Sequence, residues 1–377
     1  MNEEEAHRPI LNRVTASGFK SIEKMDLELA AMNVLIGANG AGKSNLISLF
    51  EFLGQMRAQK LRDYVARSGG ADDLLHYGAK KTPYIDICLT FPLADSSLSY
   101  EAKLAGTAKN SLFFASERTV LRITGSTEPP LIHDLGAGHA ESKLDQLAAD
   151  HMLVGVMHRM MKGCKAFHFN DTSVASRMRR GSYLYDNKNL HFDAGNLAAI
   201  LYKIRRARDE TPAYHRIVET IRQIAPWFDD FVLEPLEPNK TDVLLNWRDQ
   251  FSDRIFGPHQ LPDGALRAMA LITLLLQPEK DLPSLIVIDE PELGLHPAAI
   301  TVLAALLKAA SLHSQIIIAT QSVTFLEEFD VADVIVVDRE QGRSTFTRQD
   351  PERLKDWLED YTLGELWQKN SIGGGPF

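Results

Sequence analysis

Apolar runs and amphipathic stretches alternate along much of this chain. Four mainly apolar runs have the length of strands, at residues 33–36, 285–288, 316–319 and 334–337. The first begins with Asn33, and the continuous run at 285–288 is typical of a strand buried on both faces. Residues 264–277 and 298–310 place apolar side chains at helical spacing. Because strands that alternate with helices pair through crossover connections, the pattern predicts a parallel α/β core.

A second pattern fills the region between the first two of these runs. Residues 84–91 alternate between apolar and polar side chains, as an antiparallel strand does, and residues 99–104 and 111–123 predict further strands. Helical spacing then returns at residues 144–161, 195–207 and 212–224. No heptad pattern is sustained, so we expect an antiparallel β subdomain and a helical insertion without a long coiled coil.

A glycine-rich loop follows the run at residues 33–36. Its sequence, G-A-N-G-A-G-K-S at residues 37–44, matches the G-x-x-x-x-G-K-[ST] phosphate loop at every defined position. Glycines let the backbone close around a phosphate, and the next helix offers unpaired N–H groups and a positive dipole end. Lys43 would reach the β- and γ-phosphates, and the Ser44 hydroxyl would bind Mg²⁺. The loop predicts a nucleoside triphosphate site.

Two adjacent carboxylates follow the run at residues 285–288. Ligands of open α/β sheets bind at the carboxyl ends of strands, where Asp289 and Glu290 stand. Asp289 would bind the Mg²⁺ that Ser44 also contacts, and Glu290 would take a proton from the attacking water as a general base. The alternative is two carboxylates that cap the following helix. Together with the phosphate loop, the pair predicts hydrolysis.

The composition is that of an ordinary globular protein. The chain has 377 residues, 45% of them hydrophobic and 24% charged. No apolar run approaches the ~18 residues of a membrane span, and the acidic N-terminus lacks the features of a signal peptide. Cys88 and Cys164 fit no metal-ligand spacing, which favours a reducing compartment. We therefore expect a cytoplasmic protein with no membrane partner.

The net charge of −9 argues against nucleic acid as an obvious partner, because phosphate neutralisation dominates such binding. Two local basic clusters nevertheless leave DNA open as a partner. They are Arg177, Arg179 and Arg180 in one segment, and Lys203, Arg205, Arg206 and Arg208 in another. Runs of charge are more often solvated faces than binding sites.

These motifs resemble the stand-alone "predicted ATPase" branch of the RecF/SMC/OLD-like ABC-type ATPases, a group of AAA family ATPases. The phosphate loop continues into S-N-L at residues 44–46, and D-E-P-E-L-G-L-H-P at 289–297 is similar to a Walker B and D-loop segment. The segment L-P-D-G-A-L-R at 261–267 resembles the ABC signature, and Gln321 lies where ABC ATPases place the switch histidine. Residues 171–173, 193–197 and 363–374 extend the resemblance over nearly the whole chain.

The resemblance implies a head that dimerises head-to-tail around two ATP molecules. The phosphate loop and the 289–290 pair of one copy would face the signature loop of the other, where a helix begins near Gly264. Catalytic roles fall to Glu290, Lys43 and Gln321. The residues implied to bind nucleotide are Asn39, Gly40, Ala41, Gly42, Lys43, Ser44, Asn45, Lys20, Asp263, Gly264 and Arg267, and those implied to bind Mg²⁺ are Ser44 and Asp289.

The signature loop departs from the family's pattern. Pro262 stands where the family has serine, and proline supplies neither a hydroxyl nor an N–H. Ala265 replaces a usual threonine. Asp263 places negative charge near the expected phosphate, and Arg267, one turn farther on, would offset it. We therefore expect slow ATP hydrolysis that depends on the partner chain to close the site.

The predicted fold is an α/β, ABC-type P-loop NTPase head with a parallel core sheet, an antiparallel β subdomain and a helical insertion. We expect an N-terminal ATPase lobe with the phosphate loop and a β meander at 1–110, and a mainly helical insertion lobe at 111–240. A C-terminal ATPase lobe with the signature, Walker B and switch would occupy 241–345, followed by a C-terminal tail at 346–377.

Two functions stay open. One is an ATPase of DNA repair or anti-phage defence; the other is an ATP-gated switch with slow hydrolysis that controls a separate effector, such as a nuclease or toxin encoded nearby. A transporter motor is disfavoured because residues 45–260 separate the phosphate loop from the signature. A small-molecule kinase needs neither Glu290 nor a signature loop. Only residues 322–377 follow Gln321, too few for an appended nuclease domain and the last core strand.

Overall fold

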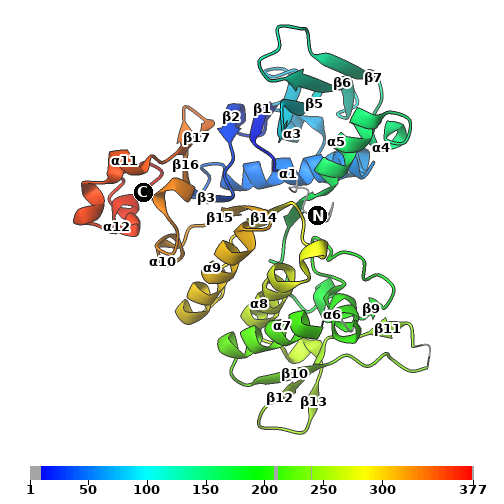
Figure 1. Cartoon of the computed structure of the whole chain (residues 1–377), viewed down its shortest axis with the longest axis vertical. Helices are drawn as coiled ribbons and strands as arrows, with labels where there is room; N and C mark the ends of the chain where they lie inside the picture. Colours follow the sequence, from blue (N-terminus) through cyan, green and yellow to red (C-terminus); the bar gives the residue numbers. More distant parts are fainter. Residues whose placement is uncertain (1–9, 208–210, 239, 376–377) are drawn as a thin grey trace. The chain divides into compact units, whose positions relative to one another are not determined.

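The computed structural model describes residues 10–207, 211–238 and 240–375. The chain divides into two compact units, which are described separately (Figure 1). The first unit comprises residues 1–166, 283–287 and 314–377, and the second comprises residues 167–282 and 288–313. Among the described residues, no helix is both long enough and apolar enough to span a membrane.

The core of the first unit is a six-stranded sheet that contains all four predicted apolar runs. In order across the sheet, its strands are β17 (Arg343–Arg348), β16 (Val334–Glu340), β3 (Met32–Ile36), β15 (Gln315–Ala319), β14 (Leu285–Asp289) and β8 (Cys164–Phe167). β3 pairs in parallel with β15 and β16, and β17 is antiparallel to β16. Every residue of β3 is buried, as expected for a strand covered on both faces. The parallel core is therefore confirmed.

A second six-stranded sheet forms the antiparallel β subdomain. Its order is β2 (Ile22–Glu28), β1 (Arg13–Phe19), β4 (Tyr84–Leu93), β5 (Ser96–Gly106), β6 (Leu112–Ile123) and β7 (Leu131–Gly136), with antiparallel pairing between neighbours. The alternation predicted in β4 is seen as burial of every second residue from Ile85 to Phe91. The sheet continues through β6 and β7, so the expected lobe boundary at residue 110 falls between two of its strands.

Helix α1 (Lys43–Arg57) lies between the two sheets in Figure 1. Its apolar residues join one buried cluster that contains side chains of both sheets, including Leu46 of the helix, Leu104 of β5 and Ile317 of β15. Each such side chain contributes about 1.5–3 kcal/mol when fully buried. The other helices of this unit are α2 (Leu61–Arg67), α3 (Ala71–Leu74), α4 (Leu144–Leu147), α5 (Met152–Lys162), α10 (Val323–Leu326), α11 (Pro351–Leu354) and α12 (Leu363–Gln368).

The second unit covers residues 167–282 and 288–313, so it holds only the later part of the insertion expected at 111–240, together with the signature helix. Its helices are α6 (Leu197–Arg206), α7 (Thr211–Ile224), α8 (Asp263–Leu276) and α9 (Pro297–Ser311). Every residue of α8 from Leu266 to Leu275 is buried, which is typical of a helix enclosed by its neighbours. Two small antiparallel sheets complete the unit, β10 (Phe228–Val232) with β12 (Asn246–Asp249) and β13 (Ile255–Phe256), and β9 (Ser182–Tyr183) with β11 (Asp242–Val243).

The C-terminal residues 363–375, here called the C-terminal hook, pack against the core sheet. Thr362 and Glu365 form a capping box at the start of α12, and Trp367 is buried. The Trp367 Nε1–H donates to the carbonyl of Gly374 at 2.7 Å. A Cβ on Gly374 would lie 3.3 Å from the Cα of Gly37, so the hook contacts the residue that begins the phosphate loop.

Candidate functional site

The phosphate loop leads from β3 into α1, in the strand–loop–helix order that the sequence predicts. Lys43 is 5% exposed, and its Nζ donates to the carbonyls of Gly37 at 2.5 Å and Ala38 at 3.2 Å. Ser44 is exposed in the first turn of α1. Among the described residues, no side chain caps this helix and no acidic residue lies in its first turn. Its N–H groups therefore fit an anionic phosphate.

Gly42 is required by the backbone of the loop. It is the N-cap of α1 and has a φ of 119°, a left-handed conformation that favours glycine. A Cβ at this position would also collide with the hydroxyl of Ser344, and it would lie 2.8 Å from that residue's Cβ. Substitution at Gly42 would thus both strain the backbone and displace β17.

A chain of hydrogen bonds through two serine hydroxyls connects the start of α1 to the backbone of the phosphate loop. Asn45 Nδ2 donates to Ser21 Oγ at 2.6 Å, the hydroxyls of Ser21 and Ser344 lie 2.6 Å apart, and Ser344 Oγ donates to the carbonyl of Ala41 at 2.5 Å. Arg339 of β16 also donates to the carbonyl of Gly40 at 3.3 Å. Sequence reasoning missed Ser21 and Ser344, because nothing in their spacing connects them to residues 37–44.

Lys20 and Gln321 lie in the same unit as the loop. Lys20, in the β1–β2 turn, has a φ of 48° and donates its N–H to the carbonyl of Leu74 at 2.8 Å. Burial lowers the pKa of its ammonium group, and the charge of Glu51 opposes that shift. Gln321 is exposed, and the preceding Thr320 donates its N–H to Leu35 of β3 at 3.0 Å. Gln321 is therefore held beside the end of the strand that carries the loop.

Asp289 and Glu290 stand at the end of β14, and both are half-buried. Glu290 has a φ of 46°, which is uncommon for a residue with a side chain. Conformations of this kind cost of order 1–3 kcal/mol and cluster at functional sites. The Glu290 carbonyl accepts a hydrogen bond from the N–H of Leu293 at 3.2 Å, so the chain changes direction in a tight turn directly after the two carboxylates.

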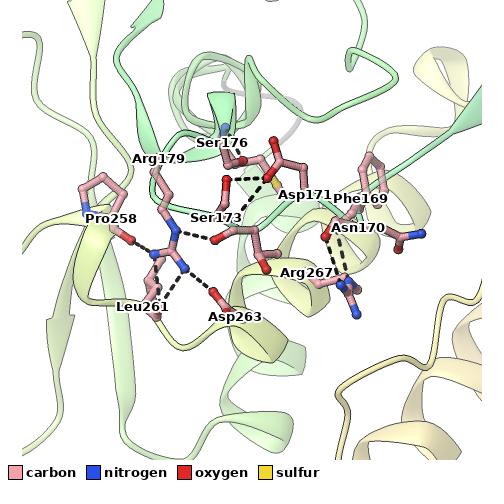
Figure 2. Close-up of polar contacts among 12 residues, drawn as sticks. Phe169, Asn170, Asp171, Ser173, Ser176, Arg179, Pro258, Leu261, Asp263 and Arg267 are labelled. Atoms are coloured by element: carbon pink, nitrogen blue, oxygen red, sulfur yellow. Dashed lines mark hydrogen bonds and ion pairs between the residues drawn. The ribbon is translucent and has the colours of Figure 1, made fainter.

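The signature and D-loop segments form one assembly within the second unit. Gly264, at the start of α8, packs so closely on the carbonyl of Gly294 that a Cβ there would collide with it. Arg267 is 7% exposed and donates to the carbonyls of Phe169 at 3.2 Å and Asn170 at 3.3 Å (Figure 2). It also donates to the carbonyl of Leu293. Arg267 thus joins α8, the D-loop and the segment at 169–170.

The arginine that pairs with Asp263 is Arg179, not the expected Arg267. The Arg179 Nη2 lies 2.6 Å from Asp263 Oδ1, and its side chain is only 6% exposed (Figure 2). Burial lowers the pKa of the Arg267 guanidinium, although the charge of Asp263 opposes this shift. Of the basic cluster at 177–180, Arg179 is therefore not a solvated charge. Arg177 is 57% exposed and pairs with Asp193 at 3.2 Å.

A pre-formed metal cage is absent from the part of the chain that the structure describes. No group of three or more His, Cys, Asp or Glu side chains there has the arrangement of a metal site. Mg²⁺ is usually held by one or two protein ligands together with the phosphates of a nucleotide. Ser44 and Asp289 are of the right chemistry for that role.

Comparison with known proteins agrees with the motifs. The family described as "AAA domain, putative AbiEii toxin, Type IV TA system" matches residues 32–101 and 245–327, which hold the phosphate loop, the signature, the Asp289–Glu290 pair and Gln321. Among curated proteins, none matches this chain in sequence.

Solved structures with the same fold include heads of Smc proteins. An Smc head bound to the C-winged helix domain of ScpA is 16% identical, with a TM-score of 0.62 over 92% of this chain and 100% of that one. A Pyrococcus furiosus Smc head with an extended coiled coil, bound to the C-terminal domain of ScpA, is 14% identical, with a TM-score of 0.59 over 93% and 99%. A Pyrococcus yayanosii Smc head has 12% identity and a TM-score of 0.53 over the same shares.

Proposed function

We propose that this chain, an ABC-type ATPase with the fold of an SMC head, binds ATP and Mg²⁺ at residues 37–44 and hydrolyses ATP between two copies of itself. The observation that carries this proposal is the phosphate loop. Its lysine already lies over the loop carbonyls of Gly37 and Ala38, and the helix behind it begins without a side-chain cap among the described residues. A triphosphate would bring negative charge to the start of this helix, where the dipole and the N–H groups favour it.

Each residue near the reaction has a distinct role. Lys43 moves its ammonium group from the loop carbonyls to the β- and γ-phosphates, and Asn39, Gly40, Ala41 and Gly42 offer backbone N–H groups. Ser44 and Asp289 would hold the Mg²⁺, which would offset the negative charge of the phosphates. Glu290 accepts the proton of the attacking water, and Gln321 orients that water. Lys20 and Asn45 would also contribute to nucleotide binding.

The second copy would supply the signature loop. Asp263, Gly264 and Arg267 stand at the start of α8, whose dipole presents positive charge toward a γ-phosphate of the partner copy. ATP then acts as a bridging ligand, and its hydrolysis separates the two copies. We propose slow turnover, since Pro262 replaces the serine that would otherwise donate to the phosphate.

Two variants test these roles. Lys43→Ala should abolish ATP binding measured by titration calorimetry, whereas Lys24→Ala, which removes an exposed lysine of β2 in the same unit, should leave it unchanged. Glu290→Gln should bind ATP normally and accumulate as an ATP-bound dimer in analytical ultracentrifugation. Retained ATP affinity in Lys43→Ala would refute the phosphate-loop assignment, and undiminished hydrolysis in Glu290→Gln would remove Glu290 from the base role.

We place this activity in DNA repair or anti-phage defence, and one observation favours a second candidate. The matching family is described by a putative AbiEii toxin and a type IV TA system, not by DNA repair, which favours the candidate that is linked to a toxin. An Smc head of the same fold is bound to a domain of ScpA, which supports a protein partner for such a head. Stimulation of ATP hydrolysis by duplex DNA favours the first candidate, and an unchanged rate favours the switch.

A further inference from the structure

Arg179 contacts three parts of the second unit (Figure 2). Its Nη1 donates to the carbonyls of Pro258 at 2.5 Å and Leu261 at 3.1 Å, and its Nη2 donates to Leu261 at 3.1 Å and to the Asp263 carboxylate at 2.6 Å. The Nε–H donates to the carbonyl of Thr172 at 2.9 Å. One planar guanidinium therefore joins the segment around residue 172 to both sides of Pro262.

The segment that carries Arg179 is itself held in place. Asp171 Oδ1 accepts the N–H of Ser173 at 3.1 Å and its hydroxyl at 2.7 Å, which closes a tight turn before Arg179. Ser176 then caps the 3₁₀ helix Arg177–Arg179, and Met178 of that helix is buried. Because its backbone is anchored, Arg179 loses little freedom when it binds the loop.

The signature loop needs such support for two reasons. Pro262 is the N-cap of α8 and has no side chain that accepts hydrogen bonds, so the loop lacks the usual cap. Asp263 follows directly and is 72% exposed in its side chain. An unpaired carboxylate there would repel the phosphates of a bound nucleotide.

We propose that Arg179 is a positioning residue of the signature loop, which fixes the Leu261 carbonyl and neutralises Asp263 so that the loop can approach the γ-phosphate of an ATP held by a second copy. This inference rests on the proposed function. It assigns a role in the ATP-bridged dimer to the segment 171–179, which lies far in sequence from the three motifs. Arg179 does not touch the nucleotide; it acts through the loop.

A purely structural role of Arg179 would give a different experimental result. If Arg179 only held the fold together, its loss would lower stability whether or not Asp263 was charged. If Arg179 also masks the charge of Asp263, then neutralising Asp263 should restore part of the dimerisation that is lost when Arg179 is replaced. Raised salt should likewise help the variant more than the parent, because salt screens exposed charges.

The test uses the full chain carrying Glu290→Gln, in which the proposed function expects ATP-dependent dimers to accumulate. Arg179→Met should weaken ATP-dependent dimerisation at least about 100-fold, because the loop carbonyls and the Asp263 carboxylate lose a charged hydrogen-bond donor. ATP binding by the monomer should not change. Adding Asp263→Asn should recover at least about tenfold of the loss, since the unmasked charge is gone. Arg177→Met, which removes an exposed neighbour, is the control and should stay within about twofold.

Arg179→Lys covers the case in which Arg179→Met fails to fold. Lysine keeps the charge but cannot hold Leu261 and Asp263 with one planar fork, so dimerisation should weaken about tenfold without added salt dependence. Dimerisation within twofold of the parent in Arg179→Lys, or no recovery from Asp263→Asn in the Arg179→Met chain, overturns the inference. If the parent itself forms no dimer with ATP, it is the proposed function that fails.

Discussion

At the scale of single residues, the antiparallel subdomain depends on one buried carboxylate. Glu117 of β6 is fully buried and accepts hydrogen bonds from Tyr100 Oη at 2.6 Å, His139 Nε2 at 2.8 Å, the Lys143 N–H at 3.0 Å and the Ser142 hydroxyl. Burial, followed by the charge of Glu117, raises the pKa of Tyr100 well above its usual value. Glu117 therefore ties β5 to the chain that leads into α4.

Replacement of Glu117 should destabilise this subdomain. Glu117→Gln places an amide N–H₂ among donors that need an acceptor, and we expect a loss of about 1–3 kcal/mol in the free energy of unfolding. Urea unfolding followed by circular dichroism measures the change. Asp86→Asn is the matched control, because the Asp86–Lys103 pair is exposed at 3.5 Å and should contribute less than about 1 kcal/mol. An unchanged midpoint for Glu117→Gln would contradict the prediction.

The two cysteines should be poor nucleophiles in the folded protein. Burial raises the pKa of Cys164 from 9.0 to about 12, and it also raises the pKa of Cys88. At pH 8, Cys164 should carry roughly a thousandfold less thiolate than an unperturbed thiol. Iodoacetamide labelling followed by mass spectrometry should therefore be slow for the native protein and rapid in urea. Rapid labelling of native Cys164 would show that its thiol is not held in its neutral form.

At the scale of elements, sequence reasoning succeeded where the determining contacts are local. The strand–loop–helix order around residues 37–44 and the buried strands each follow from a few neighbouring residues, whereas the roles of Asp289 and Glu290 stay predictions. The contacts of Ser344 with Ser21 and of Arg179 with Asp263 were not predicted, because the partners lie 323 and 84 positions apart in the sequence. Such pairs form only through the order of strands and helices in space, which residue spacing does not record.

Helix α8 offers a test at this scale through Gly264. A Cβ there would collide with the carbonyl of Gly294, so Gly264→Ala must push the signature loop away from the D-loop. We expect ATP binding to remain and ATP hydrolysis to fall at least about tenfold. Gly54→Ala in α1 meets no atom within 4 Å and should stabilise the protein by about 0.5–1 kcal/mol. Normal turnover in Gly264→Ala would separate the signature loop from the reaction.

At the scale of the whole molecule, the proposal requires two copies for each reaction. In this proposal, one copy of the chain contributes the phosphate loop, Asp289 and Glu290 to a site, and the other copy contributes the signature loop. The rate per chain should therefore rise with protein concentration until the dimer is saturated. A fast rate that does not depend on concentration would show that one copy suffices.

Mixing inactive variants tests this arrangement directly. Lys43→Ala lacks a working phosphate loop and Gly264→Ala lacks a working signature loop, so a mixed dimer holds one intact site. With random pairing and independent sites, the mixture should regain roughly a quarter of the parent rate. Mixing Lys43→Ala with Glu290→Gln is the control, since those changes leave no intact site in any dimer. Equal recovery in both mixtures would argue against a site shared between copies.

The position of β3 in the core sheet also bears on how the chain is made. This strand is flanked by β15 and β16, so Met32 pairs with Ile316 and Val34 pairs with Val334. At ribosomal speeds of about 5–20 residues per second, roughly 15–60 s separate the synthesis of β3 from that of its neighbours. During that interval the emerging strand exposes apolar edges that chaperones can cover. The nucleotide site is therefore assembled only when nearly all of the chain has left the ribosome.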